Sequence, residues 1–225
     1  MVLLILAGGA PKTFGESEAP PAPPLVGRAP DSASWTITVN QKVPLPPKSS
    51  DPKTAEYQDM LAKVNPRLLK ETVEKAGGNL HQETYWESGA KDIFWFYQGY
   101  VIFQTRMYPP DQVVIMAGTN KNAPLKPNDD FPELDWITPK VFAGTTTHDG
   151  VKCYLYTKND PKLGSTSVWI DFDSRLPIAV ESPATLNTYT FSSGPVSIVP
   201  QGIFATRYQL AMKAVDAAAH STEPR

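Results

Sequence analysis

At 225 residues the chain is long enough for one domain of ordinary size with flanking segments. Lysine and arginine number 21 against 23 aspartate and glutamate, and the net charge of −2 argues against nucleic acid as a partner. The single cysteine, Cys153, excludes an intrachain disulfide. Because it shares a face with Val151 and Leu155, we expect a buried structural thiol.

The N-terminal residues are expected to lie outside the folded domain. Residues 2–10, VLLILAGGA, form an apolar run that ends in small residues and is too short to span a bilayer. They are typical of the end of a secretory signal, and a hydrophobic first strand is the alternative. Residues 1–10 are therefore predicted to be a residual signal-like segment and 11–33 a Pro-rich linker, with no packed structure before Ser34.

The folded part begins with a predicted strand at residues 34–40, where Trp35, Ile37 and Val39 alternate with threonines. A Pro-rich connection follows. Residues 53–64 then carry apolar side chains at helical spacing, and Pro66 ends the short helix that this spacing predicts.

The region up to residue 200 has the pattern of a β-meander. Short segments with strand character are joined by tight turns, with a helical turn at 131–137 that docks Leu134 and Trp136. The predicted strands are 67–75, 80–87, 93–97, 100–105, 113–117, 141–147, 151–158, 167–172, 178–182 and 186–191. Strands at this spacing without long helices between them indicate a curved antiparallel sheet or half-barrel, a mainly β (α+β) fold.

The C-terminal segment changes its period. Apolar residues from Phe204 to Val215 recur every three or four positions, which predicts a helix at 203–219 packed on the sheet by one apolar stripe. The predicted organisation is thus a sheet domain at 34–200 and its C-terminal helix at 201–220.

One segment carries a family resemblance. In 165–182, STSVWIDFDSRLPIAVES, Val168 and Trp169 point to opposite faces of an extended strand, and a turn at 174–177 leads into a second strand. Together with TTTHDG at 145–150 and VKCYLY at 151–156, the segment resembles the C-terminal half of LolA/LolB-like bacterial envelope proteins, lipoprotein-sorting carriers and their relatives. The resemblance extends in layout over about residues 65–192. It implies a curved sheet around an apolar cavity, and it brings no catalytic motif.

Motifs for catalysis or metal binding are missing from the sequence. The three histidines, His81, His148 and His220, lie in a strand, a turn and the C-terminal tail, without Cys or His partners at ligand spacing. No nucleophile elbow, P-loop or dinucleotide-binding glycine motif is present. We therefore expect no enzyme activity, no catalytic residue, no metal and no cofactor.

The clustered carboxylates are more simply explained by turns and ion pairs than by metal binding or catalysis. Asp171 and Asp173 are expected to shape a turn, with Asp173 opening it. Residues 128–130 could be read as a Ca²⁺ ligand cluster, but the whole loop at 120–130 is expected to be solvated. Four glutamates on neighbouring strands could be read as a glycosidase pair, but cross-strand ion pairs with nearby lysines are favoured. They are Glu71, Glu74, Glu83 and Glu87.

The aromatic hairpin at 93–103 is the one candidate binding feature. Ile93, Trp95 and Tyr97 lie on one face and Phe94 and Phe96 on the other, whereas a strand with one solvated face should alternate. The hairpin must therefore be covered on both sides, by a helix on one and by loops, a partner or an apolar ligand on the other. A solid hairpin without a cavity is the alternative. The candidate ligand-binding residues are Trp95, Tyr97, Tyr100, Ile102 and Trp136.

These observations lead to one main hypothesis and one alternative. The main hypothesis is a periplasmic or secreted bacterial protein without catalytic activity. It binds a lipid or the acyl chains of a lipoprotein in the concave face of the sheet, with peripheral membrane contact possible. The alternative is an envelope protein-interaction or sensor module with a solid core and no ligand.

Overall fold

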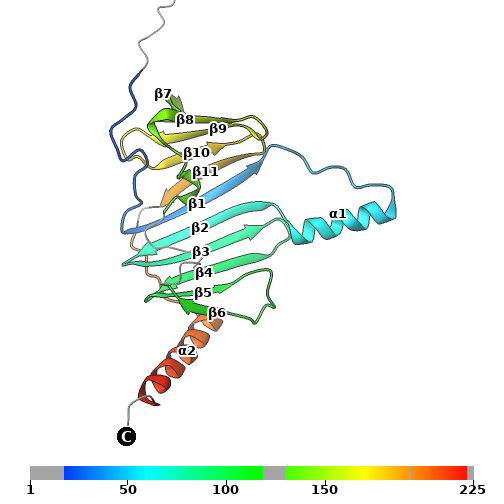
Figure 1. Cartoon of the computed structure of the whole chain (residues 1–225), viewed down its shortest axis with the longest axis vertical. Helices are drawn as coiled ribbons and strands as arrows, with labels where there is room; N and C mark the ends of the chain where they lie inside the picture. The colour runs from blue at the N-terminus through cyan, green and yellow to red at the C-terminus, as the bar shows by residue number, and fades with distance from the viewer. Residues whose placement is uncertain (1–17, 119–129, 193, 222–225) are drawn as a thin grey trace, which may run out of the picture.

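The computed structural model describes residues 18–118, 130–192 and 194–221. Its main element is one sheet of eleven antiparallel strands in the order β6-β5-β4-β3-β2-β1-β11-β10-β9-β8-β7 (Figure 1). The strands are β1 (Ser32–Gln41), β2 (Leu68–Ala76), β3 (Asn79–Trp86), β4 (Lys91–Tyr97), β5 (Tyr100–Gln104), β6 (Val114–Ala117), β7 (Phe142–His148), β8 (Val151–Asp160), β9 (Gly164–Asp171), β10 (Pro177–Glu181) and β11 (Thr185–Ser192). The helices are α1 (Pro52–Val64) and α2 (Gly202–Ser221), with 3₁₀ turns η1 (Pro132–Leu134) and η2 (Pro139–Val141). The sheet is curved and open, which confirms the predicted fold class.

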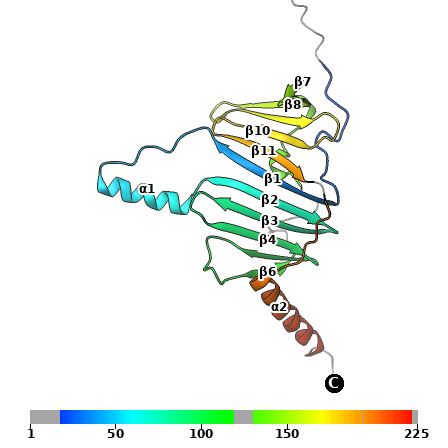
Figure 2. The ribbon, with the colours of Figure 1, turned by 180° about the vertical axis from the view of Figure 1, so that it is seen from behind.

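The first strand lies in the middle of the sheet. β1 pairs with β2 on one side and with β11 on the other, so two meanders, β2–β6 and β7–β11, extend from it in opposite directions. Figure 2 shows the same order from behind. The edge strands are therefore β6 and β7, and the chain between them carries η1 and η2.

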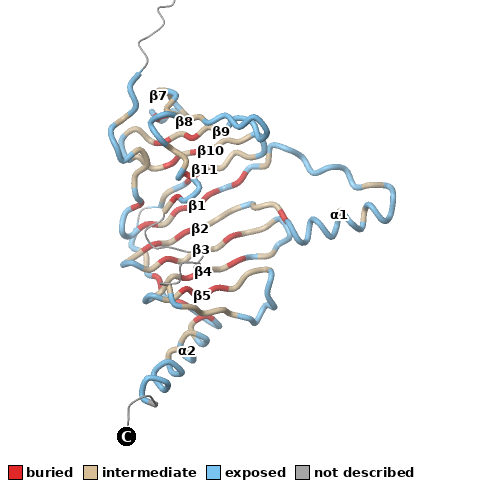
Figure 3. The backbone as a smooth tube through the Cα atoms, in the orientation of Figure 1, coloured by how far each residue is buried: buried red, intermediate tan, exposed pale blue. Residues whose placement is uncertain are grey.

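The main core lies on the face of the sheet that η1 covers, which we call the crossover face. Trp35 is only 2% exposed, and its ring lies 5.6 Å from that of Phe131 and 6.0 Å from that of Phe191. Leu134 is buried beside them. The other core residues alternate along the strands, as Figure 3 shows, and include Ile37, Val39, Val73, Leu80, Tyr156, Val168 and Ile170.

A buried ion pair fastens the crossover connection to the sheet. Lys75 Nζ lies 2.8 Å from Asp130 Oδ1, and the two side chains are only 9% and 3% exposed. Asp130 Oδ2 also accepts a hydrogen bond of 3.1 Å from the backbone N–H of Ala29. The expectation of a solvated loop is therefore wrong for Asp130, while residues 128 and 129 lie outside the described ranges.

Glu71 makes the stability of the fold depend on pH. Burial, together with repulsion from Glu133 on η1, raises the pKa of Glu71 to about 7. Because this carboxyl binds its proton more tightly in the folded state, its stabilising contribution is present below about pH 4.5 and is lost as the pH rises through 7. Glu71→Gln is expected to raise the free energy of unfolding at pH 8 by up to about 3 kcal/mol. Urea titrations of the native chain and the variant at pH 5 and 8 measure this. If the free energy of unfolding changes between the two pH values by the same amount in both proteins, the prediction is refuted. Glu74→Gln, on the opposite face of β2, is the matched control.

The segment before β1 belongs to the folded domain, contrary to the expectation of an unpacked linker up to residue 33. Ala29 is 4% exposed in the core, and the Gly27 N–H donates to the carbonyl of Arg175 over 2.7 Å. The Thr145 N–H donates to Glu18 Oε2 over 2.8 Å. Residues between the prolines, such as Gly27 and Ala29, keep a backbone N–H that can donate a hydrogen bond, and these bonds hold the segment on the domain. Residues 1–17, including the apolar run at 2–10, lie outside the described part of the chain.

The opposite face of the sheet is covered at one end by the chain after β11. We call this second face of the sheet the strap face, and we call residues 194–201, which cover it, the strap. Ile198 of the strap and Phe204 of α2 are buried against it, and Tyr208 is the next residue of α2 to pack there. Beyond that turn α2 projects past β6 and leaves Leu210 and Val215 about half exposed (Figure 1). The helix thus packs on the sheet through its first turns only, because the sheet ends at β6.

The predicted hairpin of 165–182 forms as β9 and β10. Val168 and Ile170 are fully buried, and Cys153 on the neighbouring strand is buried as expected. The turn is shaped by Asp171 rather than by Asp173, since Asp171 Oδ1 accepts from the Ser174 N–H over 2.6 Å and from the Ser174 hydroxyl over 2.8 Å.

Trp169 is an outward-facing neighbour of this core. Its ring is partly exposed and stacks on His148 with a centroid distance of 4.5 Å. Trp169→Ala is therefore expected to lower the free energy of unfolding by only about 1–2 kcal/mol, less than truncation of a buried aromatic residue. Chemical denaturation measures this, and a loss above about 3 kcal/mol would show that Trp169 is a core residue.

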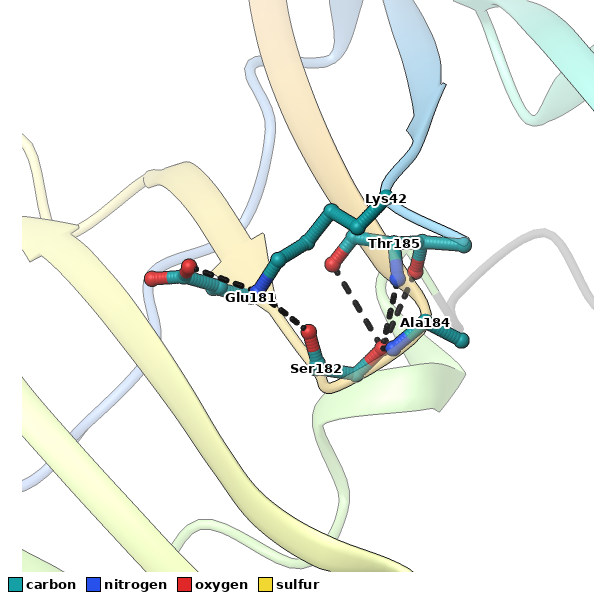
Figure 4. Close-up of polar contacts among 5 residues, drawn as sticks. All are labelled: Lys42, Glu181, Ser182, Ala184 and Thr185. Atoms are coloured by element: carbon teal, nitrogen blue, oxygen red, sulfur yellow. Dashed lines mark hydrogen bonds and ion pairs between the residues drawn. The ribbon is translucent and has the colours of Figure 1, made fainter. Parts of the chain in front are cut away.

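The far end of β1 is tied to the β10–β11 turn, as Figure 4 shows. Lys42 Nζ lies 2.9 Å from Glu181 Oε1 and donates to the carbonyl of Ser182 over 2.9 Å. The Lys42 N–H also donates to the carbonyl of Ala184 over 2.8 Å. These bonds fix the chain where it leaves the sheet toward α1.

Candidate functional site

The β4–β5 hairpin presents apolar side chains on both faces of the sheet, as the sequence predicts. A two-residue turn at Gln98 and Gly99 joins the strands, and both residues have positive φ, 49° and 81°, as a tight hairpin turn of this kind requires. The resulting register pairs Trp95 with Ile102 and Tyr97 with Tyr100. Each pair lies on the strap face, because cross-strand partners share a face.

On the strap face the hairpin packs against the strap and the first turns of α2. Trp95 is 7% exposed and Ile102 is fully buried, in one cluster with Ile198 and Phe204. Tyr208 contacts Tyr97 and Tyr100 edge to face at 5.4 and 5.9 Å, and its hydroxyl donates to Gln98 Oε1 over 2.9 Å. One face of the hairpin is thus closed by a helix, as expected.

On the crossover face the hairpin forms a second apolar cluster. Val101 and Phe103 are its buried members, and Phe94 stacks on Phe103 with a centroid distance of 5.7 Å. Phe96, Val114 and Met116 pack around them. This cluster extends the crossover face toward the β6 edge.

The structure brings four of the five expected ligand-binding residues together. Trp95, Tyr97, Tyr100 and Ile102 lie on the strap face within one hairpin. Trp136 lies elsewhere, packed against the core of the crossover face with Lys158 Nζ 4.6 Å from its ring centroid. The five side chains therefore do not line a single cavity.

An open cleft lies beside Trp95, between the strap face and the strap. Its volume is about 590 Å³. Its apolar lining is Ile93, Trp95, Val199, Ile203 and Phe204, and its polar lining is Glu74, His81, Glu83, Ser197 and Gln201, completed by Gly202. A smaller hollow of about 290 Å³ adjoins it over β1 and β2 and shares Glu74, His81 and Glu83. Apolar and polar walls thus face the same space.

The polar wall is centred on His81, which the sequence offered only as a strand residue. His81 is the cross-strand partner of Trp95, and the two rings stack with a centroid distance of 3.7 Å. Its Nδ1 lies 2.9 Å from Glu74 Oε2 and its Nε2 3.7 Å from Glu83 Oε1. The pairing register of β3 and β4 places His81 beside Trp95. The predicted meander would have indicated this pair if the length of the β3–β4 turn had been known.

Glu83 is held as a carboxylate by its neighbours. Burial opposes its ionisation, but hydrogen bonds from the Tyr85 hydroxyl and from Lys91 outweigh burial and keep the pKa of Glu83 below its ordinary value. Lys91 Nζ lies 2.9 Å from Glu83 Oε1. This is the cross-strand ion pairing that the sequence favoured over a catalytic pair.

The described residues contain no group of three or more His, Cys, Asp or Glu side chains placed to hold a metal ion. Within the same ranges, neither helix has the length and apolar character needed to cross a bilayer. The arrangement at the cleft supports binding through apolar contact and hydrogen bonds.

No protein-family model matches the chain, and no curated protein matches it either. Solved structures similar to it include the lipoprotein LppX of Mycobacterium tuberculosis, with 13% identity over 75% of this chain and 90% of that chain and a TM-score of 0.38. An uncharacterized conserved protein of Thermus thermophilus is 11% identical over 76% and 88%, with a TM-score of 0.41. A LolA superfamily protein of Nitrosomonas europaea is 10% identical over 80% and 93%, with a TM-score of 0.31. The structural neighbours thus include the family that residues 165–182 resemble.

Proposed function

We propose that the chain is a non-catalytic binding protein that takes an apolar ligand, a lipid or the acyl chain of a lipoprotein, against the strap face of the β4–β5 hairpin. The observation that carries the proposal is the cleft of about 590 Å³ beside the nearly buried Trp95. Binding sites for small molecules are clefts of this size. About half of the lining residues here are apolar, and they offer the contact surface that an apolar ligand needs. Trp95 lies in the wall of the cleft, and Tyr97, Tyr100 and Ile102 support it, whereas Trp136 has no part in this site.

The LolA/LolB-like resemblance of residues 165–182 supports a place for the protein in the periplasm or outside the cell, where such a ligand would be handled near a membrane surface. In this proposal the ligand is held and released rather than converted.

Filling the cleft tests the proposal. Val199 lines the cleft and is 51% exposed, so Val199→Phe occupies the space without disturbing the core. An uncharged fluorescent apolar probe, N-phenyl-1-naphthylamine, is expected to bind the native chain, and Val199→Phe is expected to weaken binding about tenfold, or about 1.4 kcal/mol.

Leu163→Phe is the matched control, because Leu163 is 76% exposed in the turn between β8 and β9 and does not line the cleft. Equal probe binding by both variants and the native chain would place the ligand elsewhere and contradict the site. Failure of the native chain to bind the probe, or to retain lipid in native mass spectrometry after mild purification, would contradict the function.

A second candidate function, an interaction module of the bacterial envelope, is favoured by α1. This helix stands away from the sheet (Figure 2), has no buried residue, and carries exposed Tyr57, Met60, Leu61 and Val64 along one face. An exposed apolar stripe of this kind is typical of a surface that binds another protein.

Serine substitutions on this face separate the two functions. Because Leu61 is exposed, Leu61→Ser is expected to change the free energy of unfolding by less than about 0.5 kcal/mol. Under the main proposal it leaves binding of the apolar probe unchanged. Native mass spectrometry tests the alternative. If Leu61→Ser abolishes a specific partner complex, and the folded native chain binds no apolar probe, the interaction module is favoured instead.

A further inference from the structure

A second cavity lies on the part of the chain that connects β1 to β2, residues 42–67, which we call the arm. It is an open groove of about 530 Å³ between α1 and the Pro-rich connection that precedes this helix. The arm stands away from the sheet (Figure 1), and α1 has no buried residue. The groove is therefore formed by the arm alone. Its apolar lining residues are Leu45 and Pro46 of the connection and Leu61 and Ala62 of α1.

Polar contacts hold the connection against α1 and shape the groove. Lys48 Nζ lies 2.8 Å from Asp59 Oδ2, and the Ser49 N–H donates to Gln58 Oε1 over 2.9 Å. Asp51 then caps the start of the helix. Because the prolines also restrict the backbone of the connection, the groove is formed before a ligand arrives, which lowers the entropic cost of binding.

The charged residues that line the groove favour an anion. They are two cations, Lys48 and Arg67, and one carboxylate, Asp59. Lys48 and Asp59 neutralise each other as an ion pair, whereas the guanidinium of Arg67 has no partner among the described residues. Glu87 donates its backbone N–H to the carbonyl of Arg67 over 2.8 Å but forms no ion pair with it. A guanidinium in this state can bind a carboxylate through two parallel hydrogen bonds.

The strap-face cleft has the opposite character. Its lining includes the carboxylates of Glu74 and Glu83 and no lysine or arginine. Lys91 offsets the charge of Glu83, but no lysine or arginine among the described residues pairs with Glu74. An anionic ligand is therefore repelled at the cleft and attracted at the groove.

From the lining, shape and charge of this groove we propose that the arm binds a single-chain amphiphile with a carboxylate head group, such as a fatty acid. The carboxylate bonds to the guanidinium of Arg67. The hydrocarbon chain lies along Leu45 and Leu61, which are 56% and 44% exposed and whose apolar surface the ligand removes from water. This second site does not depend on the proposed function of the strap-face cleft.

A fluorescent fatty acid, 11-(dansylamino)undecanoic acid, and its uncharged methyl ester test the head-group selection, because the two probes share one chain. In fluorescence titrations at pH 7.5, the native chain is expected to bind the acid at least about fivefold more tightly than the ester. Arg67→Gln is expected to remove this preference, weakening the acid about five- to tenfold and changing the ester less than about twofold. Lys63→Gln is the matched control, because Lys63 is an exposed cation of α1 that does not line the groove.

A second variant tests the apolar wall and does not depend on Arg67. Ala62 lines the groove and is exposed, so Ala62→Phe fills the space without disturbing a core. It is expected to weaken binding of the acid about tenfold, whereas Val199→Phe in the strap-face cleft is expected to change it less than about twofold. Thermal melts followed by circular dichroism verify the fold of each variant.

Three results would overturn the inference. The first is equal binding of the acid and the ester, or no binding of either, by the native chain. The second is equal weakening of the acid by Arg67→Gln and Lys63→Gln, which would show attraction to positive charge in general. The third is loss of acid binding in Val199→Phe with retention in Ala62→Phe, which would place the fatty acid in the strap-face cleft.

Discussion

Asp130→Asn is expected to lower the free energy of unfolding by about 3–5 kcal/mol. The substitution leaves the ammonium of Lys75 buried without its carboxylate, and both side chains are more than nine-tenths buried. It also weakens the acceptor of the Ala29 N–H, so the segment before β1 and the crossover connection lose a common anchor. Urea unfolding followed by circular dichroism measures the loss.

A double substitution separates the cost of an unpaired charge from the contribution of the pair. Lys75→Met with Asp130→Leu removes both charges, and the double variant is expected to be more stable than Asp130→Asn by at least about 2 kcal/mol. Equal losses in the single and double variants would show that packing around Asp130, rather than the charge of Lys75, sets the stability of this region.

Trp35→Ala is the second substitution with a large expected effect, a loss of about 3–5 kcal/mol in the free energy of unfolding. The ring is 2% exposed and joins the central strand to Phe131 of the crossover connection and Phe191 of β11. Its Nε1 has no hydrogen-bond partner in the described residues, so Trp35→Phe, which keeps the aromatic contact, is expected to cost much less.

Trp169→Ala serves as the comparison for this prediction, because Trp169 lies on a strand of the same sheet but is partly exposed. Losses of equal size at Trp35 and Trp169 would contradict the assignment of the main core to the crossover face.

Local structure was predictable because it depends on neighbouring residues. Alternation in 34–40 and the turn residues Gln98 and Gly99 indicate β1 and the β4–β5 hairpin, which the structure contains as Ser32–Gln41 and as a register that pairs Tyr97 with Tyr100. The change of period after residue 200 indicates the helix Gly202–Ser221.

Long-range pairing was not predictable from these patterns. Nothing local states that β1 lies between β2 and β11, or that Lys75 meets Asp130, because both depend on contacts between distant parts of the chain. The same holds for the packing of Ala29, which a Pro-rich composition conceals.

The candidate site was predictable in part. Alternation placed Trp95 and Tyr97 on one face, and cross-strand register adds Tyr100 and Ile102 to it. Neither pattern could place Trp136, because Trp136 lies in the connection between β6 and β7. The face that such a connection covers depends on how the chain crosses the sheet. His81 was missed because a lone histidine in a strand gives no signal until its partner is known.

Photo-crosslinking with a diazirine-bearing fatty alcohol tests the central claim most directly, because it reports which residues the bound chain touches. After irradiation and digestion, peptide mass spectrometry is expected to find adducts on Ile93 or Trp95 and on strap residues 197–201, with labelling suppressed in Val199→Phe. Adducts confined to Phe94 and Phe103 on the crossover face, or to α1, would contradict binding in the cleft.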